Sequence, residues 1–343
     1  MGDTQLSYVV FGAGAIGAVV GGRLSLAGCD VTLVARGAHL EALQARGLRL
    51  ESPAGADTVR LAAVGHPREV DWSANEIVLL AVKSQQTAAA LVELAAVAPP
   101  QTPIVCLQNG IANEPTVLRL FPNVYAVSVA CPASHLEPGV VNAWSTPVTG
   151  LLDIGRYPAG IDPVSEAVAA DFRAATFSSH PVDRILRWKH RKLLTNLGNA
   201  VEAVCEPHDR LGPLGDVLLA EGEAVLSAAG LEAATAQEDR DRRGDLLQPG
   251  VIAGKSRPGG SSWQSLRRAT GDIETDYLNG EIVFLGRMHG VPTPANELLQ
   301  RLARELAVTR RAPGAVPAAV ILGRLKEAGM PAHPGFGTGS TAR

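Results

Sequence analysis

The sequence predicts a two-part α/β protein, in which a parallel β-sheet comes first and a helical region follows. Up to about residue 181, short apolar segments rich in Val, Ile and Leu alternate with segments of helical apolar spacing. This alternation is typical of a parallel sheet whose strands are joined by helices. After Pro181 strand signals almost vanish, and helical spacing recurs over 183–205, 214–229, 261–270, 276–289 and 294–308.

The length of 343 residues exceeds what one hydrophobic core usually serves, so two domains are expected. We predict a first domain over 1–181 and a helical domain over 182–330. The tail 331–343 lacks core-forming residues and is predicted to be disordered. The segment 235–259 is charged and then rich in Gly and Pro, and the sequence leaves its role open.

The first predicted strand, 8–11, leads directly into glycines with the spacing G-x-G-x-x-G. A helix is predicted over 15–27 and a second, β-branched strand over 31–35. In this strand–turn–helix–strand order the motif is typical of a Rossmann-type dinucleotide-binding domain, although a structural glycine turn is the alternative. A pyrophosphate is then expected at the helix N-terminus, along Gly12, Ala13, Gly14, Ala15, Ile16 and Gly17.

The end of the second strand indicates which dinucleotide would bind. An NAD site usually has an acid here for the ribose 2′-hydroxyl. This chain has Ala35-Arg36, with no carboxylate nearby in sequence until Glu41. A guanidinium suits a 2′-phosphate in charge and in donor geometry, which favours NADP(H). A solvated surface arginine is the alternative.

Two further apolar segments, 77–82 and 104–108, predict central parallel strands. Lys83 follows the first and Asn109 the second, at the strand ends where open α/β sheets bind ligands. A surface lysine and an Asn-Gly turn are the alternatives. We also expect helices over 38–46, 85–97 and 162–175, and short strands over 48–52, 58–64, 124–130, 139–144, 148–155 and 176–180.

One helix of the second region carries a polar stripe on an apolar background. Its members recur at four, four and three residues: Trp188, Lys192, Asn196 and Asn199. Such a stripe is either the exposed side of an amphipathic helix or a strip that faces a binding site. In the second case Lys192 could protonate an alkoxide while Asn196 holds a carbonyl or carboxylate. Lys189 and Arg191 are expected to point elsewhere and to tolerate substitution.

A second polar group lies at 261–276. Ser261-Ser262 resemble a helix start, and Asp272, Glu274 and Asp276 lie at or before the first turn of the next helix. Acids are stabilised at that position by the helix dipole, so a structural role is open for each of them. Composition alone does not show which acid matters.

Together these motifs resemble the ketopantoate reductase (2-dehydropantoate 2-reductase) family over about 7–310. The resemblance depends on segments at 12–17, 82–84, 108–110, 191–196, 261–262, 273–280 and 289–299, and on Arg36. It implies a Rossmann-type N-terminal domain and an all-helical C-terminal domain, with NADPH and a 2-oxo acid in the cleft between them. It also implies roles: Lys192 and Glu274 as catalytic residues, Asn109, Asn196 and Ser262 at the substrate, and Arg36 and Lys83 at the cofactor. From their positions in the sequence, Asn199 of the polar stripe is also expected at the substrate, and Asn109 also at the cofactor.

The substrate side departs from the family pattern at two places. The family often has an asparagine four residues after the one at Asn196, where this chain has Ala200 and, one step early, Asn199. A glutamine–aspartate pair that usually follows the two serines is absent from Trp263-Gln264-Ser265-Leu266. The resemblance therefore implies reduction of ketopantoate in pantothenate biosynthesis, with another 2-oxo acid or a non-catalytic NADPH-binding regulator as alternatives.

Composition excludes several other classes of function. The net charge of −3 offers no general attraction to nucleic acid or to an anionic membrane. The four cysteines are scattered without a C-x-x-C pair, so neither a metal site nor disulfides are expected, and the cytoplasm is the expected compartment. No segment reaches transmembrane length or resembles a signal peptide. The sequence does not fix the oligomeric state, and a homodimer is one option.

Overall fold

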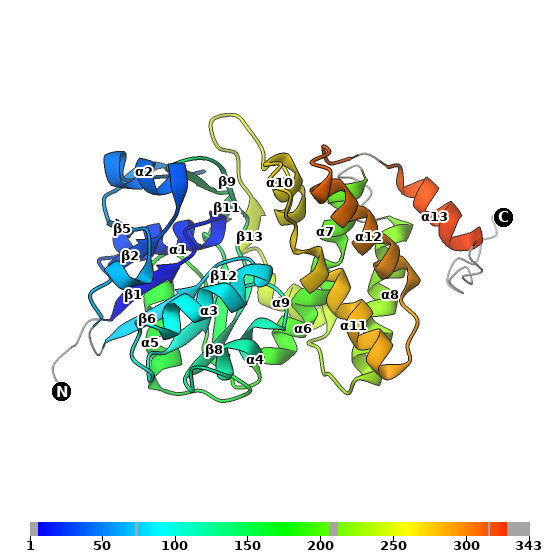
Figure 1. The fold of residues 1–343 in the computed structure, drawn as a ribbon, viewed down its shortest axis with the longest axis horizontal. Coiled ribbons are helices and arrows are strands. Elements are labelled where there is room, and N and C mark those ends of the chain that lie inside the picture. The colour runs from blue at the N-terminus through cyan, green and yellow to red at the C-terminus, as the bar shows by residue number, and fades with distance from the viewer. Residues whose placement is uncertain (1–5, 73–74, 206–211, 315, 328–343) are drawn as a thin grey trace. The chain divides into compact units, whose positions relative to one another are not determined.

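The computed structural model describes residues 6–72, 75–205, 212–314 and 316–327 (Figure 1). The chain forms two compact units. Unit 1 comprises Met1–Leu193 and Leu231–Pro258, and unit 2 comprises Leu194–Gly230 and Gly259–Arg343. Each unit thus contains two separate stretches of the chain. A domain boundary at residue 181 remains a prediction, and the predicted disordered tail lies outside the described residues.

Unit 1 is built on a seven-stranded sheet in the order β12-β8-β7-β6-β1-β2-β5. Six strands run parallel, and the edge strand β12 pairs antiparallel with β8. The strands are β1 (Ser7–Phe11), β2 (Asp30–Val34), β5 (Ala62–Val64), β6 (Glu76–Leu80), β7 (Ile104–Cys106), β8 (Val124–Ala130) and β12 (Leu151–Arg156). The segment predicted as a strand at 176–180 makes only an isolated bridge from Ser178 to Leu151.

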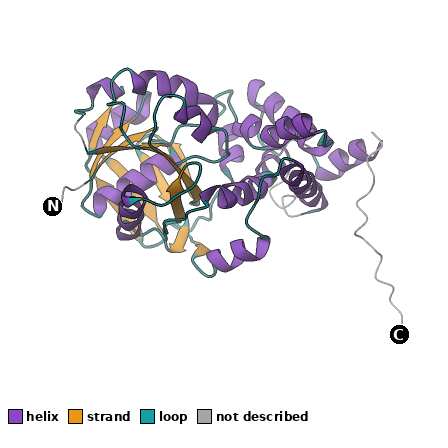
Figure 2. Ribbon diagram, turned by 90° about the horizontal axis from the view of Figure 1, so that it is seen from below, coloured by secondary structure: helices purple, strands orange, loops and turns teal. Residues whose placement is uncertain are grey.

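Helices cover both faces of this sheet, as Figure 2 shows for unit 1. Alternate residues of β1 point to opposite faces: Tyr8 and Val10 pack with α1 (Ala15–Leu26) and α5 (Pro163–Ala174). Val9 and Phe11 pack on the other face with α3 (Thr87–Ala95) and α4 (Asn113–Leu118). Burying one such side chain contributes about 1.5–3 kcal/mol. This explains why the strands have unbroken apolar sequences rather than alternating ones.

Unit 1 contains two smaller sheets. One has the order β4-β3-β10-β9, and the other pairs β11 with β13. Their strands are β3 (Leu48–Ser52), β4 (Gly55–Val59), β9 (Ala133–Glu137), β10 (Val140–Ala143), β11 (Ser145–Pro147) and β13 (Leu247–Pro249). Helix α2 (Gly37–Arg46) lies between β2 and β3 in the chain. The strand at 247–249 was not predicted, and it joins the segment 235–259 to unit 1.

Unit 2 is helical, which confirms the predicted change after Pro181 (Figure 2). The predicted helix 183–205 is divided into α6 (Ile185–Asn196), which begins in unit 1, and α7 (Gly198–Val204). The others are α8 (Pro213–Ala228), α10 (Ser261–Arg267), the 3₁₀ turn η4 (Glu274–Tyr277), α11 (Asn279–His289), α12 (Pro294–Val308) and α13 (Ala318–Glu327). In the described part of the chain, no helix is both long and apolar enough to cross a membrane.

A buried polar network joins three of these helices. Glu221 of α8 accepts hydrogen bonds from the backbone N–H groups of Ala295 (2.9 Å) and Asn296 (3.0 Å), and so caps α12. The Asn296 side chain also accepts from Asn279 of α11 at 3.0 Å. Asn279 and Asn296 are fully buried. Two of the most specific motifs of the C-terminal region, at 273–280 and 289–299, thus contain residues that hold the fold together.

Asp162 begins α5 with a capping box, and its loss should destabilise the protein. Its carboxylate accepts from the Ser165 backbone (2.9 Å), the Tyr125 hydroxyl (2.7 Å) and Arg156 (2.9 Å). We expect Asp162→Ala to lower the free energy of unfolding by about 0.5–2 kcal/mol, as measured by urea denaturation. Glu166→Ala, which removes an exposed carboxylate of the same helix that is not part of the capping box, is the control.

The pH dependence of this cap has a definite sign. Burial opposes ionisation of Asp162, but the hydrogen bonds from Ser165, Tyr125 and Arg156 outweigh it and lower its pKa. A lowered folded-state pKa means that the cap stabilises the protein above the unfolded pKa of ~3.9 and loses this effect as the pH falls through the folded value. The difference between wild type and Asp162→Ala should therefore be full at pH 7 and shrink below about pH 4. A difference that grows on acidification would contradict this explanation.

Candidate functional site

The glycine turn after β1 has the geometry of a phosphate cradle. Gly12 has φ +108°, and a Cβ there would lie 2.7 Å from the Val82 backbone nitrogen. A Cβ at Gly17 would lie 2.2 Å from the Gly12 carbonyl oxygen, so the close approach of α1 also requires glycine. At Gly14 the same construction meets no atom within 4 Å. The space beside Gly14, at the start of α1, is therefore open to a ligand.

The residues of this turn fit a dinucleotide pyrophosphate. Helix α1 begins after Gly14 and has no acidic residue in its first turn. Its first N–H groups have no partners within the helix, and its dipole places partial positive charge at this end. Both features attract an anion.

The parallel register brings three further candidates to the same edge of the sheet. Phe11, at the end of β1, is level with Val34 of β2 and with Leu80 of β6, and Leu80 is level with Cys106 of β7. The loops that follow these strands therefore lie along one edge. They carry the glycine turn, Arg36, Lys83 and Asn109. The structure thus brings together the predicted cofactor-binding residues of unit 1.

Two of these loops are joined by a buried hydrogen-bond network. Asn113 donates to the Ser84 hydroxyl (3.1 Å) and to the Asn109 carbonyl oxygen (3.0 Å), and it accepts from Thr87 (2.8 Å). Gln108 donates to Thr87 at 2.9 Å and to the Val82 carbonyl oxygen at 2.8 Å. Ser84 and Gln108 therefore hold the backbone of the two loops that carry Lys83 and Asn109.

Arg36 forms an ion pair that the sequence did not indicate. Its Nη2 lies 2.7 Å from both carboxylate oxygens of Glu93 on α3. The Arg36 side chain is 68% exposed, so its guanidinium is accessible to solvent and to a ligand. His66 Nε2 lies 3.9 Å from the same carboxylate. Exposed pairs of this kind contribute at most about 1 kcal/mol, so the pair can open at little cost.

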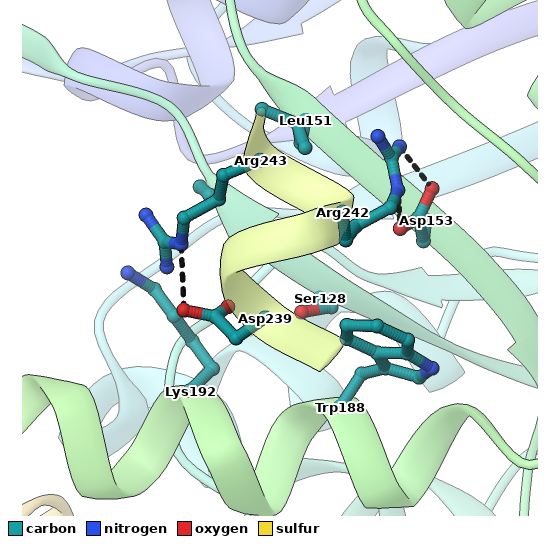
Figure 3. Close-up of a pocket in the computed structure, with 9 residues that line it drawn as sticks. Ser128, Leu151, Asp153, Trp188, Lys192, Asp239, Arg242 and Arg243 are labelled. Atoms are coloured by element: carbon teal, nitrogen blue, oxygen red, sulfur yellow. Dashed lines mark hydrogen bonds and ion pairs between the residues drawn. The ribbon is translucent and has the colours of Figure 1, made fainter. Parts of the chain in front are cut away.

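Lys192 lines a small pocket in unit 1, seen close up in Figure 3. The pocket lies at the carboxyl end of β8, where β8 runs parallel with β7. Lys192 comes from α6, and α9 (Ala236–Arg243) forms the opposite wall. The lining residues are Ser128, Ala130, Leu151, Asp153, Trp188, Lys192, Asp239, Arg242 and Arg243. Of the polar stripe predicted on this helix, Trp188 and Lys192 thus line one pocket.

Cys131, a partly buried cysteine, directly follows Ala130 of this pocket. Burial raises the pKa of Cys131 to about 12, although Arg257, Arg23 and Lys192 are close enough to oppose that shift by their positive charge. A raised pKa disfavours the thiolate, which is the nucleophilic form of cysteine. Among the described residues, no group of three or more His, Cys, Asp or Glu could hold a metal ion.

Lys189, one turn before Lys192, was expected to tolerate substitution, but the structure buries it. Its side chain is 2% exposed, and its Nζ lies 2.5 Å from the buried Glu114 carboxylate. Nζ also donates to the Gln108 carbonyl oxygen at 2.9 Å. Arg191 is likewise buried and donates from Nε to the Ala234 carbonyl oxygen at 2.6 Å. Neither residue lines the Lys192 pocket, as expected, but both are buried and anchor the helix that carries Lys192, which contradicts the expectation that they tolerate substitution.

Unit 2 holds the remaining site residues predicted from the sequence. Asn196, Asn199, Ser262 and Glu274 are all buried. Asn199 lies on α7, which packs against α10, the helix that begins at Ser261 and contains Ser262. Glu202 of α7 accepts from the Gly260 backbone N–H at 2.8 Å, and a Cβ at Gly260 would lie 3.6 Å from Asn199 Oδ1. The structure thus brings Asn199 to the start of the helix that carries Ser262.

Glu274 differs from the two acids beside it. It is 4% exposed on η4, whereas Asp272 and Asp276 are both partly exposed. Asp276 accepts a hydrogen bond from Gln300 of α12 at 2.7 Å. Asp276 also lies 3.5 Å from Arg304. A structural role is therefore apparent for Asp276, as the sequence left open. Of the three acids at 272–276, only Glu274 is buried.

Comparison with known proteins identifies the family. The family model described as Ketopantoate reductase PanE/ApbA matches residues 8–158, and its C-terminal counterpart matches 184–307. A 2-dehydropantoate 2-reductase of Caulobacter vibrioides is 30% identical and is aligned over 88% of this chain and 99% of its own. The chain belongs to the ketopantoate reductase family. It is therefore an oxidoreductase of that family, and the resemblance seen in its motifs is confirmed.

Two further members of the family extend over almost the same length. A 2-dehydropantoate 2-reductase of Pyrococcus horikoshii is 28% identical, with 87% of this chain and 97% of the relative aligned. The crystal structure of a PanE/ApbA family ketopantoate reductase from Ralstonia eutropha superposes with a TM-score of 0.74 at 29% identity, covering 88% of this chain and 99% of that one. A D-mandelate dehydrogenase structure shares the fold, with a TM-score of 0.75 at 22% identity over 88% of this chain and 99% of that one.

Several polar residues of this ketopantoate reductase family member were missed by sequence reasoning. Glu93, Glu114 and Glu202 each gain a partner from a distant element, and nothing local in the sequence identifies that partner. Asp239 and Arg243 could have been noticed as an i,i+4 pair on a charged helix. The sequence does not show that this helix, α9, lies against Lys192.

Proposed function

We propose that this member of the ketopantoate reductase family uses NADPH to reduce a 2-oxo acid to the 2-hydroxy acid, with 2-dehydropantoate as the substrate. One observation carries the proposal: Lys192 lines a pocket at the same carboxyl edge of the sheet that bears the glycine turn. Three strand spacings separate β1 from β8, about 14 Å. An extended dinucleotide could therefore lie along this edge, with its reactive end near Lys192.

The proposed mechanism assigns each step to a group on this chain. A reduced nicotinamide cofactor, when bound, would supply the hydride that the carbonyl carbon of the substrate accepts. Lys192, as an ammonium, stabilises the charge that develops on the carbonyl oxygen and then gives it a proton. The glycine turn and Arg36 are proposed to hold the cofactor phosphates. Lys83 and Asn109 are proposed to bind the cofactor from the loops after β6 and β7, which the Asn113 hydrogen-bond network joins. Within unit 2, Glu274 is proposed to orient the substrate, together with Asn196, Asn199 and Ser262.

A second substrate class is favoured by one feature of the pocket. Trp188 lies in its lining, so an aromatic 2-oxo acid could stack there. The D-mandelate dehydrogenase that shares the fold was solved with NADH and anilino(oxo)acetate, a ligand with an aromatic ring. The departures at Ala200 and Leu266 also fall on the substrate side.

Oxidation of NADPH, followed by absorbance, should distinguish these functions. We expect the highest kcat/KM with 2-dehydropantoate in a panel that includes 2-oxoisovalerate, pyruvate and phenylglyoxylate. A preference for phenylglyoxylate would favour the aromatic substrate class. Tight NADPH binding without turnover of any acid would contradict the enzymatic proposal and favour a regulator.

Cofactor choice can be tested at Arg36. Each charge-assisted contact to a 2′-phosphate contributes about 1.5–3 kcal/mol, so Arg36→Asp should weaken NADPH binding by roughly 10-fold or more and leave NADH binding nearly unchanged. The Kd values are measured by calorimetry. Arg49→Asp is the matched control, because Arg49 is another exposed arginine paired with a glutamate at 2.7 Å. If the wild-type protein binds NADH as tightly as NADPH, the role assigned to Arg36 is wrong.

A further inference from the structure

The role of the segment 235–259 was left open by the sequence, and its helix α9 forms a wall of the Lys192 pocket. Helix α9 begins with a capping box between Thr235 and Glu238. Its end is held on the sheet by Arg242, which donates from Nε and Nη2 to the two Asp153 oxygens, both at 2.7 Å. Asp153 is buried in β12, so this bidentate pair is shielded from solvent.

The start of α9 is fixed to the helix that carries Lys192. The backbone N–H of Ala234 donates to the Arg187 carbonyl oxygen at 2.9 Å, and Arg191 donates to the Ala234 carbonyl oxygen at 2.6 Å. Both arginines belong to α6. Since α9 is tied to α6 at one end and to β12 at the other, the positions of Lys192 and of the α9 side chains are set together.

Arg243 is the side chain of α9 that remains available to a ligand. Its Nε lies 2.7 Å from Asp239 Oδ2, one turn earlier on the helix. Figure 3 shows Lys192 pointing toward this Asp239–Arg243 pair. The Arg243 side chain is 32% exposed and makes no other side-chain hydrogen bond or ion pair within the part of the chain that the structure describes. Its two terminal nitrogens thus have no hydrogen-bond or ion-pair partner among the described residues.

The charges of the pocket favour an anion. Its lining contains three cationic side chains and two carboxylates, which leaves one net positive charge. Arg242 is neutralised by Asp153, so the excess charge lies with Lys192 and Arg243, which flank Asp239. A 2-oxo acid has a carboxylate and a carbonyl on adjacent carbons, so it needs two donors a short distance apart.

We propose that Arg243 binds the substrate carboxylate through its two terminal nitrogens while Lys192 serves the adjacent carbonyl, and that Asp239 positions Arg243 by holding its Nε. This proposal rests on the proposed function and makes α9 a specificity element for that reaction. Arg243 touches the substrate in this arrangement, whereas Asp239 acts only through Arg243. The guanidinium fork matches a carboxylate better than a lysine would.

Steady-state kinetics with an acid and its neutral amide tests the role of Arg243. Removal of one charge-assisted hydrogen bond to the substrate corresponds to roughly 10- to 150-fold. We expect Arg243→Gln to lower kcat/KM for the 2-oxo acid by that range, mainly through KM, and to leave kcat/KM for the corresponding 2-oxo amide nearly unchanged. The acid-to-amide preference should therefore collapse, while the Kd for NADPH and the melting temperature remain those of the wild type.

Two further variants separate a specific role from a structural one. Arg240→Gln removes an exposed arginine of the same helix that does not line the pocket, and it should change none of these quantities. Asp239→Asn keeps an acceptor for Nε and should reduce the acid-to-amide preference less than Arg243→Gln does. An Arg243→Gln enzyme that keeps the wild-type preference would overturn the proposal.

Binding measurements keep the test independent of turnover. Calorimetric titration of pantoate into the protein saturated with NADP⁺ should give a Kd at least roughly 10-fold weaker for Arg243→Gln than for the wild type. If the wild type turns over no 2-oxo acid but this difference is found, the proposed function fails and the carboxylate site stands. If wild type and Arg243→Gln bind pantoate equally, or neither binds it, the carboxylate site is refuted.

Discussion

Replacement of Lys192 by alanine should lower kcat by at least roughly 100-fold. A positioned general acid typically contributes 10²–10⁴-fold, and a donor aimed at a developing oxyanion contributes a similar factor. Lys192 lines the pocket at the carboxyl edge of β8 and is not part of the buried anchor of α6. Its removal should therefore leave the NADPH Kd and the melting temperature nearly unchanged. The comparison to make is kcat beside melting temperature.

The controls for this experiment follow from the structure. Neither Lys189 nor Arg191 is suitable, because both are buried and their removal would disturb the helix itself. Lys255→Ala is the better control, since Lys255 is an exposed lysine of the same unit and does not line the pocket. Lys192→Arg keeps the charge but is a poorer acid, so it should retain more activity than Lys192→Ala. A stable, nearly fully active Lys192→Ala protein would remove this residue from the chemistry.

Most of the fold could be predicted because its signals are local. The apolar strands of the central sheet and the helices that follow them have periods that can be counted in the sequence. The pairing of β13 with β11 could not be foreseen, because it joins Leu247 to Pro147 across 100 residues with only three residues in each strand. The attachment of α9 through Arg242 and Asp153 depends on a contact of the same kind.

The candidate site divides in a similar way. Gly12, Arg36, Lys83 and Asn109 were placed correctly at one sheet edge, because each follows a parallel strand and parallel strands end on the same side. Their roles in binding remain predictions. The environment of Lys189 was not predicted, because it depends on a residue that is distant in the sequence. Helical spacing shows which residues share a side of α6, but not that Glu114, 75 positions earlier, lies buried against that side.

Replacement of Lys189 by methionine should lower the free energy of unfolding by about 3–5 kcal/mol. Methionine keeps the length of the side chain but leaves the Glu114 carboxylate buried without its cation. The Glu114 side chain is 0% exposed, so it cannot recover its hydration without local unfolding. The Gln108 carbonyl oxygen is also deprived of a donor. Urea unfolding followed by circular dichroism measures the destabilisation, and an exposed pair, Arg287–Glu297, provides the matched control through Arg287→Met, which should cost less than about 1 kcal/mol.

The double variant Lys189→Met/Glu114→Leu separates two causes of destabilisation: the loss of the Lys189–Glu114 ion pair, and the cost of burying the Glu114 carboxylate without a cation. If most of the destabilisation comes from the unpaired carboxylate, then removing that carboxylate as well should restore a large part of the stability, because buried ion pairs can often be replaced by apolar side chains at little cost. The activity should not recover to the same extent, since Lys189 also fixes α6 to the loop that carries Asn109. A double variant no more stable than Lys189→Met would show instead that the pair itself, and not the desolvated carboxylate, sets the stability of this part of unit 1.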